Sequence, residues 1–260
     1  MDQKTDPNLP ALPVPLPPDP APEIAALARR WKRANGPVMA LVTRMGGALE
    51  SQLSVLPEAL RQRIEDLTAR ALETAYGVAA QGARLPETRG HGTLAAALAT
   101  GAAGGAGGIA TAIAEMPFTI TVLLHAIRRE AVLAGYDPDD PWIRAEALRT
   151  FGSGSPVASD DGIDTSFFTA RLTLTGPAIQ GLIARVAPRL AAALGQKLAA
   201  QSVPLLGAVS GAALNAAFLS YYREAAAIRF ALMRLAETHG AAPVIEAFAA
   251  ATAPPRITRA

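Results

Sequence analysis

The 260-residue sequence contains no cysteine, which excludes disulfide bonds, thiolate catalysis and cysteine-ligated zinc. Aromatic residues make up only 5% of the chain, although half of its residues are hydrophobic, so a core must depend on close packing of small side chains. Charged residues reach 18%, and the net charge of +2 is too small a basic excess to indicate a nucleic-acid partner. Alternating β-branched stretches are also missing. We therefore expect an all-α protein with a single multi-helix domain.

The N-terminal residues differ from the rest of the chain in their proline content. Residues 1–22 hold eight prolines between Pro7 and Pro22, which block both helix and sheet and predict a disordered arm. We expect the helical domain to cover residues 23–252 and a short tail to cover residues 253–260. The first ten residues do not show the basic and then apolar pattern of a signal peptide, which favours a cytoplasmic location.

The first predicted helix, residues 23–34, combines an apolar face with a cluster of cations. Ile24, Leu27 and Trp31 share one face, since they repeat at helical spacing. Such a helix suits a membrane surface, but it equally suits a surface helix that inserts its tryptophan into the core. We favour the second interpretation and keep the first as a hypothesis. The membrane-surface candidates are Arg29, Arg30, Trp31, Lys32 and Arg33.

Residues 92–114 carry no charge and are dominated by alanine and glycine. Four glycines at positions i, i+3, i+4 and i+7 lie on one side of a helix, where they allow another backbone to approach closely. These are Gly101, Gly104, Gly105 and Gly108. The run is long enough to span a bilayer, but alanine and glycine gain little from lipid, so we expect a buried helix. An apolar helix should then begin at Pro117 and end at Gly135.

A second small-residue face is predicted on the last long helix, which should run from Pro204 to about His239. Gly207, Gly211 and Asn215 lie four residues apart and therefore stack on one side. We predict that this face packs against the first glycine face, with Glu115 and Asn215 fixing the register. A buried Glu115 carboxylate needs donors, and both the Asn215 amide and the backbone N–H groups beside Pro117 are candidates.

Further helices are expected at residues 37–56, from residue 57 onward, at 141–151, at 166–200 with restarts at Pro177 and Pro188, and at 243–251. The acidic segment from Asp137 to Asp140 leaves two interpretations open. Three carboxylates are suitable ligands for a hard cation, whereas an Asx turn followed by an Asp140 cap is the simpler structure. We favour the turn and predict no metal site and no cofactor.

These motifs resemble those of the EcsC family of bacterial helical proteins. In that family a Gly/Ala-rich segment leads to an acidic residue, a spacer and a proline, and an apolar helix then ends in Gly-x-Asp. The matching residues are Glu115, Pro117, Gly135 and Asp137, followed in the later segment by Pro204, Gly207, Gly211 and Asn215. The resemblance covers roughly residues 57–239. His125 stands where the family often has arginine.

The resemblance implies little about mechanism, because the family is named for a gene beside an ABC transporter and its activity is undefined. It favours a non-enzymatic protein at the inner face of a membrane, with a transporter, another membrane protein, a lipid or a hydrophobic ligand as partner. One alternative is a hydrolase-like enzyme whose site gathers Glu115, His125 and Asp137. The other is an integral membrane protein that inserts the two Gly/Ala-rich helices. A lone histidine is more often packed or exposed than a metal ligand.

Overall fold

The computed structural model describes residues 18–34, 57–80, 99, 108–152, 176–201 and 207–253, and these residues form seven helices and no strand. The expectation of an all-α fold is confirmed. The helix expected at residues 37–56 lies outside the described residues. So do Gly101, Gly104 and Gly105, and most of the proline-rich arm.

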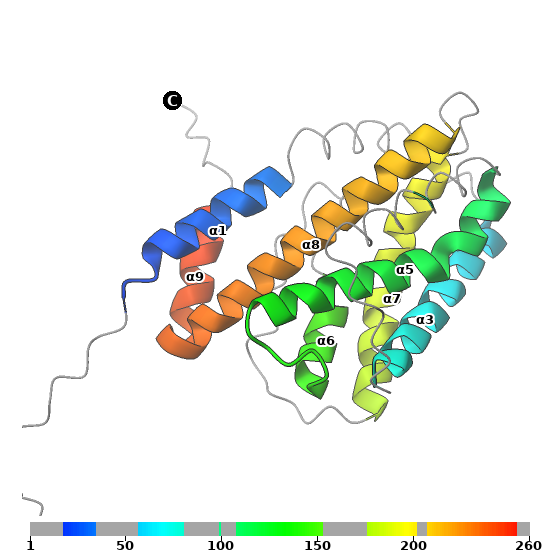
Figure 1. Cartoon of the computed structure of the whole chain (residues 1–260). Coiled ribbons are helices and arrows are strands. Elements are labelled where there is room, and N and C mark those ends of the chain that lie inside the picture. The colour runs from blue at the N-terminus through cyan, green and yellow to red at the C-terminus, as the bar shows by residue number, and fades with distance from the viewer. Residues whose placement is uncertain are drawn as a thin grey trace, which may run out of the picture.

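The longest helix, α8 (Gly207–His239), lies at the centre of the described structure (Figure 1). Its 33 residues span about 50 Å, and its middle section is buried around most of its circumference. It packs against five other helices, which are α1 (Ala21–Ala34), α5 (Gly108–Leu133), α6 (Pro141–Thr150), α7 (Gly176–Gln201) and α9 (Ala241–Thr252). The remaining helix, α3 (Glu58–Ala80), packs on α5 and α7.

Two prolines that were expected to begin helices lie inside them instead. Pro117 is in the first half of α5, and Pro188 is in the middle of α7. Proline costs a helix interior about 3 kcal/mol, but a helix in a protein is stabilised mainly by packing of its apolar face. Both prolines are exposed, so their rings lie on the solvent side and leave the packed faces intact. The expected start at Pro117 and restart at Pro188 are therefore wrong.

Helix α5 ends close to Gly135 as predicted, because this glycine forms the C-terminal cap. This residue has a φ of 85°, in the left-handed region that favours glycine. The Gly135 amide donates to the Val132 carbonyl at 2.9 Å, and the Tyr136 amide donates to the Ala131 carbonyl at 3.0 Å. These two bonds form a Schellman motif, which satisfies the last carbonyls of the helix.

The acidic segment after Gly135 forms the turn and the cap that were favoured over a cation site. Asp137 Oδ1 accepts a hydrogen bond from the Asp139 amide at 2.9 Å. Asp140 Oδ1 accepts from the amides of Trp142 and Ile143 at 2.7 and 3.3 Å and so caps α6. Among the described residues, no three or more histidine, aspartate or glutamate side chains are placed so that they could hold a metal ion together.

Candidate functional site

Glu115 and Asn215 lie in contact across the interface between α5 and α8. Asn215 Nδ2 donates to Glu115 Oε1 at 2.8 Å, and Thr119 Oγ1 donates to the same oxygen at 3.0 Å. Asn215 is 2% exposed. Two kinds of donor were proposed for Glu115, and the structure shows a hydrogen bond from the first, the side-chain amide of Asn215. This bond joins two helices from distant parts of the sequence.

The two glycine faces are only partly described. Gly108 begins α5, Gly207 begins α8 and Gly211 follows one turn later, but their surroundings lie outside the described residues. The helices α5 and α8 do pack together. Direct contact between the two glycine faces stays a prediction.

His125 and Asp137 do not join Glu115 in a single site. Glu115 and His125 are ten residues apart on the same helix, a distance of about 15 Å along its axis. Asp137 lies beyond the end of α5, exposed and engaged in its Asx turn. At this spacing Glu115 and His125 do not converge on one point, so the structure does not gather the three residues of the hydrolase-like alternative in a single site.

The basic helix α1 inserts its tryptophan into the core. Trp31 is 6% exposed, and its ring centroid lies 6.1 Å from that of Tyr221 on α8. Ile24 and Leu27 are buried beside it. The favoured interpretation is confirmed, and the alternative in which Trp31 faces a membrane does not fit this structure.

The cations of α1 divide into one that is paired and three that face solvent. Arg30 binds Glu224 of α8 through Nε and Nη2 at 2.7 and 2.9 Å. This hydrogen-bonded carboxylate raises the pKa of Arg30 above its ordinary value, with a further contribution from the charge of Glu130. The three exposed cations are Arg29, Lys32 and Arg33.

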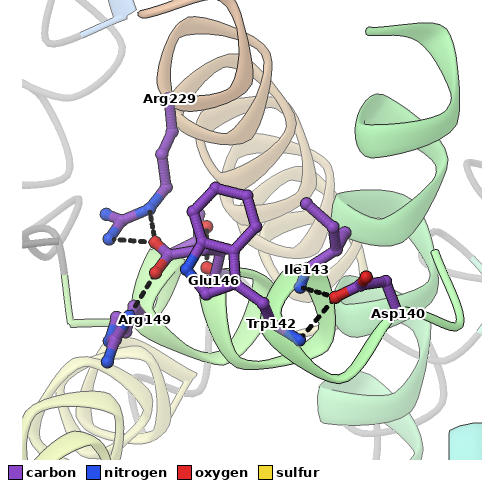
Figure 2. Close-up of polar contacts among 7 residues, drawn as sticks. Asp140, Trp142, Ile143, Glu146, Arg149 and Arg229 are labelled. Atoms are coloured by element: carbon purple, nitrogen blue, oxygen red, sulfur yellow. Dashed lines mark hydrogen bonds and ion pairs between the residues drawn. The ribbon is translucent and has the colours of Figure 1, made fainter. Parts of the chain in front are cut away.

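A triad of charges centred on a fully buried carboxylate was not found by sequence reasoning. Arg229 of α8 donates to Glu146 Oε2 of α6 from Nε at 3.0 Å and from Nη2 at 2.8 Å, and Arg149 pairs with the other Glu146 oxygen (Figure 2). Glu146 is completely buried, and Arg229 is 2% exposed. The only local signal was the spacing of three between Glu146 and Arg149. Nothing in the sequence pattern pointed to Arg229.

A second buried cation joins α6 to α3. The guanidinium of Arg144 lies 4.0 Å from the ring centroid of Tyr76, and its Nη2 donates to the Tyr76 carbonyl at 2.5 Å. Burial lowers the pKa of Arg144. The contact combines a cation–π interaction with a charge-assisted hydrogen bond, and it links α6 to α3.

A charged cleft of about 400 Å³ opens between α1, α5 and α8. Its size falls within the range of small-molecule sites. Two ion pairs line it, Arg30 with Glu224 and Arg223 with Glu130, and Arg223 Nε lies 3.1 Å from Glu130 Oε1. The remaining lining residues are Ala216, Leu219, Ser220 and Ala227. Since the ion pairs join residues far apart in the sequence, no local motif predicted this cleft.

A model of the EcsC protein family matches residues 41–235, about three quarters of the chain. The chain belongs to the EcsC family. No curated protein and no solved structure matches the sequence. In the described part of this EcsC protein, none of the helices is both long enough and apolar enough to cross a membrane.

The first and last described helices of this EcsC protein lie outside the residues that the family model matches. Both α1 and α9 lie outside residues 41–235, and they pack against each other and against α8 (Figure 1). The charged cleft lies where this terminal pair meets the family region, because Arg30 comes from α1 and the other lining residues come from α5 and α8.

Proposed function

We propose that this EcsC protein is a non-catalytic helical protein that binds the anionic cytoplasmic face of a membrane through the solvent-facing cations of α1. The observation that carries the proposal is the exposure of Arg29, Lys32 and Arg33 on a helix whose apolar side is buried. Their spacing of i, i+3 and i+4 places them on one face of α1. A membrane-protein partner with an acidic surface is the second candidate for this face.

The way in which α1 is held supports this proposal. Trp31 and its buried neighbours fix the helix on α8 and α9, and the ion pair from Arg30 to Glu224 adds a directional contact. The three exposed cations can therefore contact a surface while α1 stays packed on the protein. Each cation near an anionic lipid surface contributes about 1 kcal/mol, so binding through three of them should be weak, reversible and sensitive to salt.

Flotation with vesicles tests the proposal. The wild-type protein should float with vesicles that contain phosphatidylglycerol at low ionic strength and should not float with pure phosphatidylcholine. The double variant Arg29→Glu/Lys32→Glu should lose flotation, because it turns two attractive charges into repulsive ones.

The matched control is Arg63→Glu/Arg70→Glu, which reverses two exposed charges on α3 and changes the net charge equally. It should float like the wild type. Equal loss in both double variants would mean that net charge, and not the α1 face, determines binding. Unchanged flotation of the α1 variant would refute the proposal.

A further inference from the structure

We propose that the cleft between α1, α5 and α8 binds a small zwitterion that carries a primary ammonium group and a phosphate or carboxylate group. Phosphoethanolamine, either as a soluble compound or as a lipid headgroup, has this chemistry. The inference is independent of the proposed membrane contact, because it concerns different residues and a ligand that carries a cationic as well as an anionic group.

The two ion pairs in the cleft are not equally complete. Arg30 and Glu224 form a two-pronged contact in which both carboxylate oxygens accept a hydrogen bond. Glu130 receives a single bond, from Arg223 Nε to its Oε1 at 3.1 Å, and no described residue donates to its second oxygen. The same geometry leaves both terminal nitrogens of Arg223 without a protein acceptor among the described residues.

The environment of Glu130 makes this incomplete pair unusual. The Glu130 side chain is 10% exposed, whereas that of Arg223 is 45% exposed. The second oxygen of Glu130 is not among the buried polar atoms that lack a hydrogen-bond partner, so water reaches it through the cleft. A ligand donor that enters the cleft would replace this water on a carboxylate that the protein largely shields from solvent, where a charge-assisted hydrogen bond is stronger than at an exposed site.

The chemistry of the ligand follows from the two unsatisfied groups. The second oxygen of Glu130 accepts N–H donors, so it suits a primary ammonium better than a quaternary one, which has no N–H. The terminal nitrogens of Arg223 suit a phosphate or carboxylate, which accept from two guanidinium donors at once. Because these groups belong to one ion pair, they lie side by side and match a ligand whose two charges are close together. Ser220, exposed at the same cleft, offers a hydroxyl.

Calorimetric titration of the full-length protein with O-phosphoethanolamine tests the inference, with inorganic phosphate and ethanolamine titrated separately. The test variants are Glu130→Gln, which removes the charge and keeps the shape, and Arg223→Gln on the more exposed side of the pair. The control is Glu73→Gln, an exposed carboxylate on α3. Circular dichroism and thermal unfolding without ligand establish that each variant is folded.

The inference predicts that phosphoethanolamine binds at least about tenfold more tightly than phosphate or ethanolamine, because only the zwitterion satisfies both groups. Both cleft variants should weaken binding at least about tenfold, and Glu73→Gln should not change it. A parallel flotation assay compares phosphatidylethanolamine with phosphatidylcholine vesicles, both without anionic lipid. Flotation with the first alone, lost in both cleft variants, would identify a lipid headgroup as the source even if the soluble compound fails to bind.

Three results would overturn the inference. The first is no binding of either form of phosphoethanolamine. The second is binding that Glu130→Gln and Arg223→Gln leave unchanged, which would place the ligand elsewhere. The third is equal affinity for phosphate alone, which would show a simple anion site in which Glu130 has no part.

Discussion

At the scale of single residues, the charge triad around Glu146 is the feature with the largest expected effect on stability. Glu146 holds two arginines, one of which, Arg229, is almost completely buried. Removing the carboxylate would leave a buried guanidinium without its counter-charge, which is far more costly than the net contribution of the intact pair.

We predict that Glu146→Ala lowers the free energy of unfolding by about 3–5 kcal/mol, measured by urea denaturation. The double variant Glu146→Leu/Arg229→Met should be markedly less destabilised than Glu146→Ala, because both charges leave the core together. If the double variant is the less stable of the two, the triad is a net stabilising contact and this description of its energetics is wrong.

Tyr222 carries a buried polar group whose removal should not destabilise the protein, in contrast to the removal of the Glu146 carboxylate. Its side chain is fully buried beside Phe151 and Phe218, and its hydroxyl has no hydrogen-bond partner among the described residues. Because an unsatisfied buried hydroxyl is unfavourable, Tyr222→Phe should leave stability unchanged or raise it by up to about 1 kcal/mol. A loss of more than about 1 kcal/mol in urea denaturation would mean that the hydroxyl has a stabilising partner.

The same residue links stability to alkaline pH. Burial, with a smaller effect from neighbouring Tyr221, raises the pKa of Tyr222 above its ordinary value of 10.0. The unfolded chain therefore ionises this residue at a lower pH than the folded protein does. Its contribution to stability is complete below pH 10 and is lost as the pH rises further. Tyr222→Phe should be less sensitive than the wild type to unfolding above pH 10.

At the scale of helices, the register of α5 against α8 is supported by the bond from Asn215 to Glu115, beside the ion pair between Arg223 and Glu130. Asn215→Ala should destabilise the protein by about 1–3 kcal/mol, because Glu115 loses a buried donor. Asn215→Asp should be worse at neutral pH, since it places a second carboxylate beside the first, and should recover as the pH falls towards 4. Ser220→Ala, at an exposed position of α8, is the control. A neutral Asn215→Ala would show that this hydrogen bond does not set the register.

The helices themselves were predictable wherever the signal was local. The buried face of α1, the Asp140 cap and the left-handed Gly135 all follow from residues within one or two turns of each other. The positions of Pro117 and Pro188 were misjudged because tertiary packing outweighed a local cost. The long-range pairs were not predictable, since Arg30 and Glu224 are 194 residues apart and Glu146 and Arg229 are 83 apart. Only the Glu115–Asn215 contact was anticipated across such a distance, from the glycine pattern around it.

At the scale of the whole molecule, the protein combines a family region, residues 41–235, with a terminal pair of helices, α1 and α9, that packs on α8. Helix α1 of this pair presents a basic face outward and contributes Arg30 to one side of the charged cleft. These two surfaces are distinct. A variant of the α1 face should leave zwitterion binding intact, and a variant of Glu130 should leave binding to anionic vesicles intact.

The central claim is that α1 binds an anionic surface with its outer cations while Trp31 stays in the core. The most direct test is quenching of Trp31 fluorescence by brominated lipids, in a Trp142→Phe variant that leaves Trp31 as the sole tryptophan. With brominated vesicles that contain phosphatidylglycerol at low salt, the account predicts that the protein floats but its fluorescence is not quenched. Quenching in the floated fraction would show that Trp31 leaves the core and inserts, and a failure to float would show that the basic face of α1 does not bind membranes.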